Sequence, residues 1–224
     1  MIDNDKVSLG NKYASDGNND LVDRLFYPLL FRITKHIPSS IKPNYLTVAA
    51  FIFGVLSAIS LICITSKYAL IVSSLCIFFW WFFDGLDGIH ARNTNQCSTF
   101  GAFLDHFFDT LFAGIFLFAV LYYFNLFSPL FVFLVILRLM TQAVFFLSQV
   151  FIRVLFLPKL GPSCETFAVI VIFILVFFYD ESIIKVALMS YFLLLPYAIY
   201  SIYIRTLHTI IHRELIFQDH HDSK

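Results

Sequence analysis

Residues 68–124 read YALIVSSLCIFFWWFFDGLDGIHARNTNQCSTFGAFLDHFFDTLFAGIFLFAVLYYF, and this stretch decides the fold class. It contains two long apolar runs, 68–83 and 100–124, and the first of them continues past Asp84. A helix needs about 20 largely apolar residues to span a membrane, whereas a transmembrane β-barrel needs alternating strands of about ten residues. Because both runs are solidly apolar, the stretch predicts two transmembrane helices joined by a short linker, 88–99.

Further apolar runs extend this pattern over most of the chain. They cover residues 45–65, 129–151, 166–179 (with a start near Ser163) and 183–203. The chain has 224 residues, of which 59% are hydrophobic and 13% are charged, against about 45–50% and about 25% in soluble domains. We therefore expect an all-α integral membrane protein with six transmembrane helices. Zero net charge also argues against a basic nucleic-acid binder, so we expect no nucleic-acid partner.

Three segments of different composition divide the chain. Residues 1–20 are polar and are expected to be flexible, residues 21–207 form the membrane domain, and residues 208–224 form a polar C-terminal tail. The polar, acidic start of the chain lacks the apolar core of a signal peptide, so none is expected.

Residues 21–37 form a candidate amphipathic helix ahead of the first span. Its apolar and basic residues recur at helical spacing: Leu21, Leu25, Phe26, Leu29, Leu30 and Ile33, interleaved with Arg24, Arg32 and Lys35. Such a helix is typical of the membrane interface. We predict an N-terminal interfacial helix, and the alternative, a helix packed on the bundle, stays open.

The distribution of positive charge predicts the orientation. With six spans, both termini lie on one side, and that side carries twelve of the fifteen lysines and arginines. The opposite side carries Lys67 and Lys185, and Arg138 lies inside a span. Cytoplasmic loops are enriched in Lys and Arg. We therefore expect a multi-pass protein with both termini in the cytosol, in a bacterial inner membrane or an ER/Golgi-type membrane.

Four of the fifteen acidic residues fall within 26 positions, at the expected cytosolic ends of two consecutive spans: Asp84, Asp87, Asp105 and Asp109. Ionisable residues inside a bilayer are costly and mark function. The spacings i, i+3 and i, i+4 place each pair on one face of its helix, so two antiparallel helices would bring the four carboxylates together. Oxygen ligands suit Mg²⁺, Mn²⁺ or Ca²⁺ rather than Zn²⁺. Two such ions about 4 Å apart can clamp a phosphoryl group.

Small residues and one arginine lie among these acids. The small residues are Gly85, Gly88, Ala91, Gly101 and Ala102, and the arginine is Arg92. Small side chains leave space for a ligand against the backbone, and a guanidinium offers a planar fork of donors to a phosphate. Helix packing is the alternative explanation of the small residues, but it does not explain the acids and the arginine.

Residues 84–109 follow the pattern D-x-x-D-G-x-x-A-R, eight residues, G-x-x-x-D-x-x-x-D. This pattern resembles the signature of the CDP-alcohol phosphatidyltransferase family, as do the six-span plan and the segment 43–47 (PNYLT). The resemblance implies transfer of a phospho-alcohol from a CDP-alcohol to a hydroxyl acceptor, with release of CMP. It implies that two Mg²⁺ or Mn²⁺ ions are bound by Asp84, Asp87 and Asp105. The fourth acid, Asp109, would share in metal binding or take the acceptor's proton.

The same resemblance implies roles for the residues around the acids. It places Gly88, Ala91, Arg92 and Gly101 in the nucleotide and phosphate region, and Asn44 near the cytidine. It is also compatible with a homodimer.

The stretch 105–109 (DHFFD) is similar to the D-H-x-x-D of choline and ethanolamine phosphotransferases, which use diacylglycerol as acceptor. His106, which titrates near neutral pH, is then a candidate general base. The segment 161–165 (GPSCE) resembles a later part of that subgroup, where Glu165 could orient His106 or help to deprotonate the acceptor. Its alternative role is a favourable negative charge at a helix N-terminus.

Other interpretations remain at this point. The chain is shorter than the eukaryotic phosphotransferases, and Ile89 stands where Lys or Arg is frequent in the family. It could instead be a synthase that joins serine, inositol or glycerol phosphate to CDP-diacylglycerol. A divalent-cation transporter is disfavoured, because no internal repeat or interrupted midplane helix is evident. Arg138 could contact an acceptor phosphate, pair with an acid or line a helix contact.

Overall fold

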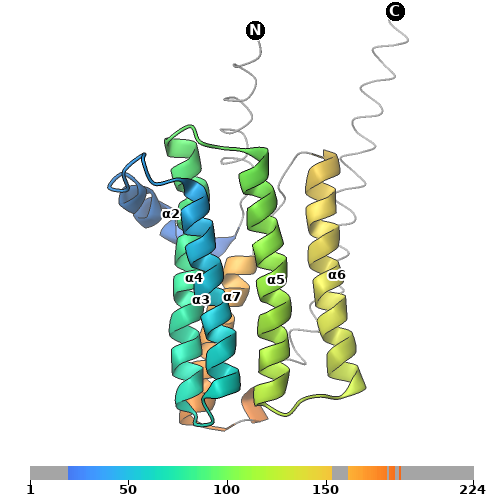
Figure 1. Ribbon diagram of the computed structural model, residues 1–224. Coiled ribbons are helices and arrows are strands. Elements are labelled where there is room, and N and C mark those ends of the chain that lie inside the picture. Colours follow the sequence, from blue (N-terminus) through green and yellow to red (C-terminus); the bar gives the residue numbers. More distant parts are fainter. Residues whose placement is uncertain (1–19, 153–160, 181, 185–186, 188–224) are drawn as a thin grey trace, which may run out of the picture.

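The computed structural model describes residues 20–152, 161–180, 182–184 and 187, and the regular structure in these ranges is entirely α-helical (Figure 1). The helices are α2 (Leu21–Thr34), α3 (Pro43–Cys63), α4 (Tyr68–Asn93), α5 (Thr99–Tyr123), α6 (Pro129–Ile152) and α7 (Pro162–Phe178). Helices α3 to α7 run lengthwise along the bundle, while α2 lies across it at one end. The predicted all-α class is therefore confirmed for the described residues.

The apolar runs form the long helices of the bundle. Among the described residues, α3, α4 and α5 are each long and apolar enough to cross a membrane. Two shorter apolar stretches, Pro129–Ala143 and Pro162–Phe178, lie in α6 and α7. The run at 183–203 lies almost entirely outside the described residues, as do residues 1–19 and the tail 208–224.

Helix α4 is longer than the sequence analysis predicted. The linker was expected to begin at Gly88, but the helix continues to Asn93, so the connection to α5 covers only residues 94–98. The extension is favourable because Ile89 and His90 are buried in the bundle, and this packing offsets the weak helix propensity of Gly88. Asn95 turns the chain in the left-handed region, with φ of 56°. Ser98 then caps α5 by accepting a hydrogen bond from the Gly101 amide at 2.9 Å.

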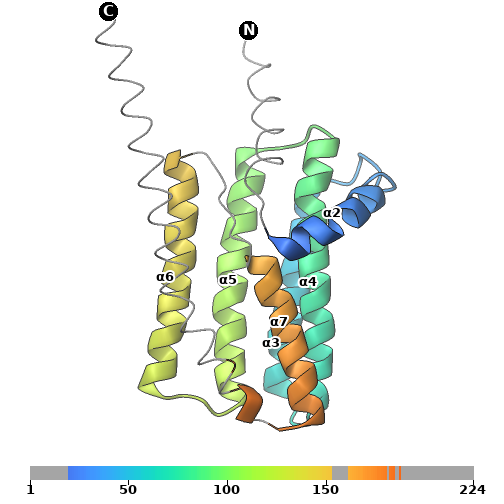
Figure 2. The ribbon, with the colours of Figure 1, turned by 180° about the vertical axis from the view of Figure 1, so that it is seen from behind.

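Helix α2 has one buried face and one exposed face. Phe26 packs its ring against Trp81 of α4 and Phe167 of α7, with centroid distances of 5.3 and 5.6 Å. On the outer face, Leu21, Leu25 and Leu29 are 53%, 73% and 51% exposed. Figure 2 shows α2 lying against α4 and the start of α7. The helix is thus packed on the bundle, as one interpretation predicted, and keeps a free apolar stripe on its other side.

Asp20 ties α2 to α7. It is fully buried, and its Oδ1 accepts a hydrogen bond from the Val22 amide at 2.9 Å, which caps α2. Its Oδ2 accepts from the amides of Ser163 and Cys164 at 3.1 and 3.3 Å, which caps α7 as well. One carboxylate thus satisfies free amides at two helix N-termini, where negative charge is also favoured by both helix dipoles.

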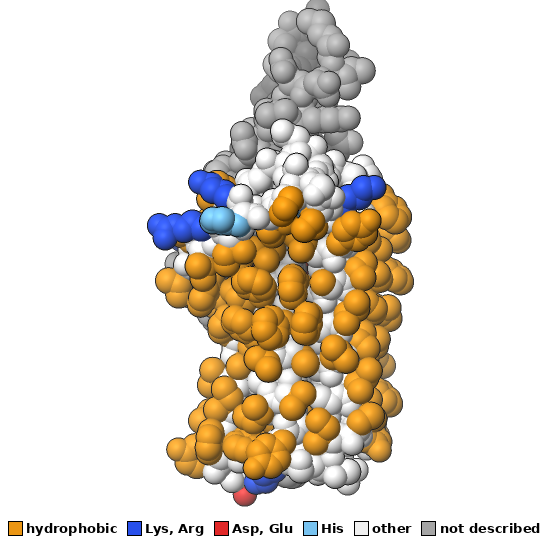
Figure 3. Space-filling model, turned by 60° about the vertical axis from the view of Figure 1, so that its left-hand side comes forward, with side chains coloured by type: hydrophobic (Ala, Val, Ile, Leu, Met, Phe, Trp, Pro, Cys, Tyr) orange, Lys and Arg blue, Asp and Glu red, His pale blue; other side chains and the backbone are white. Residues whose placement is uncertain are grey.

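The surface carries a broad band of hydrophobic side chains between two polar ends. Figure 3 shows this band over one face, with Lys, Arg and His side chains at one end and a smaller group of basic and acidic side chains at the other. Exposed large apolar residues of α3 and α5 contribute to it, including Ile52, Leu56, Phe103 and Phe118. A soluble monomer rarely exposes so large an apolar patch, and the band therefore agrees with burial of these helices in lipid.

Candidate active site

Helices α4 and α5 bring the four aspartates together at the end of the bundle where α2 lies. One carboxylate oxygen from each of Asp84, Asp87 and Asp105 lies within 4.8 Å of the others. A second group with the same separation limit consists of Asp105, His106 and Asp109. Asp105 therefore belongs to both groups. The predicted convergence of the carboxylates is confirmed. Helix α3 packs along both α4 and α5 and so holds these two helices in position relative to each other.

The donor set fits divalent cations. Asp87 is 7% exposed, and the other three aspartates are half-buried. Like charges so close together in a partly dry environment repel strongly, and a bound cation would relieve that repulsion. The first group offers oxygen atoms only, which is the donor type that Mg²⁺ and Mn²⁺ prefer. The shared Asp105 places the two groups side by side, so the residues present could hold metal ions in adjacent positions.

His106 lies at the edge of this cluster, between α5 and α6. Its Nδ1 is 3.8 Å from Oδ2 of Asp105. Its ring stacks on Phe146 of α6, with a centroid distance of 4.2 Å and an interplanar angle of 26°. The stacking restricts the orientation of the imidazole beside the carboxylates. Sequence reasoning did not identify Phe146, because nothing in an apolar run distinguishes this phenylalanine from its neighbours.

Glu165, in the first turn of α7, pairs with Arg138 of α6. The distance between Oε2 of Glu165 and Nη2 of Arg138 is 2.8 Å, and Nη1 of Arg138 donates to Gln142 at 3.2 Å. Of the three possibilities that the sequence left open for Arg138, the structure therefore shows pairing with an acid. The position of Glu165 also agrees with a negative charge at a helix N-terminus.

The predicted substrate-binding residues occupy two neighbouring places. Gly88 and Ala91 lie on the face of α4 that carries Asp84 and Asp87, because these residues are three or four positions apart. A Cβ atom on Gly88 would approach Nη1 of Arg92 to 3.3 Å, so the glycine leaves room for the guanidinium along the helix. The sequence analysis placed Arg92 in the linker 88–99. In the structure, Arg92 lies in the last turn of α4.

The second place is the junction of the first turns of α3 and α5. A Cβ atom on Gly101 would lie 3.1 Å from Oδ1 of Asn44 and 3.0 Å from Oγ of Ser98. The absence of a side chain at Gly101 thus lets Asn44 approach the start of α5. The structure therefore brings Asn44 and Gly101 together, although they are far apart in the sequence.

Comparison with known proteins decides the family. The sequence model of CDP-alcohol phosphatidyltransferases matches residues 40–209, which is most of the chain. The chain belongs to this family. All predicted site residues, from Asn44 to Glu165, lie inside the matched range. Together with the apolar helices, membership supports an integral membrane protein and a transferase.

Several curated relatives are similar to this CDP-alcohol phosphatidyltransferase family member. Choline/ethanolaminephosphotransferase 1 of Saccharomyces cerevisiae is 30% identical over 108 residues, which is 45% of this chain and 27% of the relative. Cholinephosphotransferase 1 of Gallus gallus is 29% identical over 108 residues, which is 45% of this chain and 32% of the relative. Choline/ethanolaminephosphotransferase 1 of Arabidopsis thaliana is 29% identical over 107 residues, covering 45% and 28% of the two chains. The match thus spans only about a third or less of these relatives, and it confirms the predicted resemblance to that subgroup.

Hydrogen bonds to the connection between α2 and α3, close to the site of this family member, were not predicted. Nε2 of His90 donates to the Ile41 carbonyl at 2.9 Å, since a carbonyl can only accept. Gln96 donates to the Ser39 carbonyl at 2.7 Å. These bonds hold the connection between α2 and α3 against the last turn of α4 and against the connection that follows it. They join residues about 50 positions apart or more, so no local pattern in the sequence could have indicated them.

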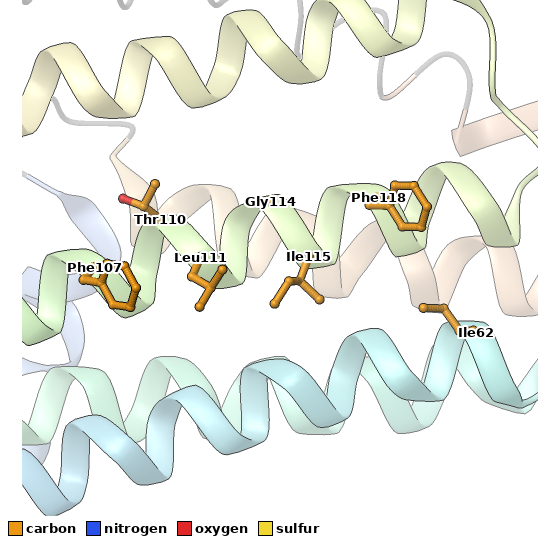
Figure 4. Close-up of a pocket in the computed structure, with 7 residues that line it drawn as sticks. All are labelled: Ile62, Phe107, Thr110, Leu111, Gly114, Ile115 and Phe118. Carbon is orange, nitrogen blue, oxygen red and sulfur yellow. The ribbon is translucent and has the colours of Figure 1, made fainter.

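A separate pocket of about 520 Å³ lies between α5 and the end of α3 (Figure 4). Its lining is almost entirely apolar: Ile62, Phe107, Thr110, Leu111, Gly114, Ile115 and Phe118. Phe107 and Leu111 each follow a site aspartate by two positions and therefore project about 200° around the helix from Asp105 and Asp109. This pocket offers no charged donors to a nucleotide and is not part of the candidate active site.

Proposed function

We propose that this chain transfers a phospho-alcohol from a CDP-alcohol to a hydroxyl acceptor and releases CMP. The observation that carries the proposal is the convergence of the four motif aspartates of α4 and α5 at one end of a bundle of apolar helices. Membership of the CDP-alcohol phosphatidyltransferase family supports it.

For the substrates we propose CDP-choline or CDP-ethanolamine, with diacylglycerol as acceptor. The D-H-x-x-D sequence at 105–109 supports this choice, as do the names of the similar proteins, choline/ethanolaminephosphotransferase and cholinephosphotransferase. An amphiphilic acceptor also suits a site at the end of apolar helices, because its acyl chains can stay in the bilayer while its hydroxyl reaches the carboxylates.

In this proposal Asp84, Asp87, Asp105 and Asp109 hold two Mg²⁺ or Mn²⁺ ions. Such ions neutralise a diphosphate and stabilise the charge that develops on the CMP leaving group. Arg92 donates to a substrate phosphate. Gly88, Ala91 and Gly101 leave space for the substrate against the backbone, and Asn44 binds the cytidine. Positioning of this kind provides most of the catalysis in phosphoryl transfer.

The acceptor hydroxyl must lose its proton to a base within hydrogen-bond reach. We assign this role to His106, whose ring is held by Phe146 beside Asp105. Asp109 completes the metal site and is the alternative base. Glu165 supports proton removal on the acceptor side, with Arg138 fixing its carboxylate.

The proposal includes a topology. Six transmembrane helices place both termini and the active site in the cytosol, and α2 lies in the membrane interface. The exposed apolar stripe of Leu21, Leu25 and Leu29 and the exposed side chains of Arg24 and Arg32 support that position, since such helices pair an apolar face with cations that contact lipid phosphates. The cations at the α2 end support the cytosolic side. The membrane domain would then extend to residue 207, and a homodimer is part of the proposal.

A test of this function measures CMP release by the purified full chain. The panel crosses CDP-choline, CDP-ethanolamine and CDP-diacylglycerol with diacylglycerol, serine, inositol and glycerol phosphate, each in Mg²⁺, Mn²⁺ or EDTA. We expect turnover with CDP-choline or CDP-ethanolamine and diacylglycerol, and none in EDTA. If CDP-diacylglycerol is the only CDP compound that is turned over, the proposed substrates are wrong. If no pair of substrates releases CMP, the enzyme assignment is contradicted.

A further inference from the structure

Thr47 of α3 makes a direct hydrogen bond to one of the candidate metal ligands. Its Oγ1 donates to Oδ2 of Asp87 on α4 at 2.5 Å. Both side chains are buried, with Thr47 5% and Asp87 7% exposed. The bond joins two helices that pack closely along their length. Thr47 lies in the segment PNYLT, for which the sequence suggested a role only for Asn44.

The choice of acceptor distinguishes Thr47 from other buried threonines of the bundle. A threonine hydroxyl has one proton to donate, and the other nearby acceptor, the Pro43 carbonyl, is 3.4 Å away. Two other buried threonines, Thr141 and Thr166, donate instead to carbonyls of their own helices, those of Leu137 and Pro162. Thr47 thus directs its proton to a carboxylate of another helix.

We propose that Thr47 is a positioning residue that fixes the Asp87 carboxylate as a ligand in the group formed by Asp84, Asp87 and Asp105. This inference rests on the proposed metal site. The terminal torsion of an aspartate is broad, so a buried carboxylate without a fixed partner can rotate away from its neighbours. A donor to one oxygen restricts that rotation and stabilises the charge that a cation requires. Loss of such a partner typically lowers metal affinity by about 10- to 100-fold.

The test measures Mn²⁺ binding by the purified full chain with electron paramagnetic resonance. Thr47→Val keeps the side-chain shape but removes the donor, and Thr47→Ser keeps the donor. Thr141→Val is the matched control, because it removes a buried threonine hydroxyl that bonds within its own helix. We expect Thr47→Val to weaken Mn²⁺ binding by about 10- to 100-fold, while Thr47→Ser and Thr141→Val stay within about threefold of the parent protein, well below that loss.

Three results of the Mn²⁺ measurement would overturn the inference, and they differ in what they refute. Parent-like Mn²⁺ affinity in Thr47→Val would refute the role of Thr47 alone, and so would equal losses in Thr47→Val and Thr47→Ser. No Mn²⁺ binding by the parent protein would refute the metal site itself, and the role of Thr47 with it.

A second measurement covers a folding defect. Circular dichroism and thermal unfolding in EDTA show whether each variant folds, and Thr47→Ala replaces Thr47→Val if the valine is not accommodated. Thr47→Val should also need about 10- to 100-fold more Mg²⁺ than the parent protein for half-maximal turnover, and its kcat should be recovered at saturating Mg²⁺. A lowered unfolding temperature with an unchanged Mg²⁺ requirement would indicate a structural role only and overturn the proposal.

Discussion

Arg138 of α6 and Glu165 of α7 form an ion pair with 2.8 Å between Nη2 and Oε2. The Arg138 side chain is 16% exposed, so removal of Glu165 would leave a largely buried guanidinium without its carboxylate. Uncompensated buried charges are costly. The pair therefore couples two helices that contain no other charged residue.

For this pair we predict that Arg138→Ala and Glu165→Ala are each destabilising, and that the double variant loses less than the sum. Coupling energies between residues in contact are about 0.5–3 kcal/mol. The measurement is a double-mutant cycle of unfolding free energy in detergent. Arg138→Lys should keep only part of the coupling, because an ammonium lacks the planar fork that also reaches Gln142. Strict additivity would show that the pair contributes nothing.

Asp105 is predicted to have a wider effect than Asp87, because it belongs to both ligand groups. Asp87→Asn should weaken one Mn²⁺ site, whereas Asp105→Asn should weaken two, and both variants should abolish turnover. Titration of bound Mn²⁺ per chain separates these outcomes. Asp180→Asn is a suitable control, since Asp180 is exposed just beyond the end of α7. A fully active Asp87→Asn or Asp105→Asn would refute the metal assignment.

His106→Gln is predicted to lower kcat by about 10²–10⁴-fold, the usual contribution of a general base. The KM for the CDP-alcohol should change little, because His106 is assigned to the acceptor proton. The pH–rate profile should also lose its low-pH limb, which a packing role would not cause. Phe146→Leu removes the ring on which His106 stacks and should give a smaller loss of kcat. Normal rates in His106→Gln would transfer the base role to Asp109.

Asp20→Ala is predicted to destabilise the fold by about 1–3 kcal/mol, the cost of leaving buried donors unsatisfied. The amides of Val22, Ser163 and Cys164 would lose their acceptor. Thermal unfolding of the purified protein measures the change. Arg24→Ala, an exposed position on the same helix, is the control and should shift stability by at most about 0.5 kcal/mol. Equal effects of the two variants would argue against the double cap.

The local regularities of the sequence predicted much of this structure. Apolar runs of sufficient length become helices regardless of their neighbours, and the i, i+3 and i, i+4 spacings place Asp84 with Asp87 and Asp105 with Asp109 on single faces. The end of α4 was not predictable in this way. Whether Gly88 breaks the helix depends on the burial of Ile89 and His90, which is a property of the packed bundle.

By itself, the sequence determined the helical class, the placement of each aspartate pair on one helix face, and the family. Only the tertiary structure decided that Glu165 pairs with Arg138, that α2 is buried on one side and exposed on the other, and that Thr47 donates to Asp87. The physical reason is the range of the interactions. Periodicity along one helix specifies which residues share a face, but a hydrogen bond or ion pair between helices depends on how those faces are packed against one another.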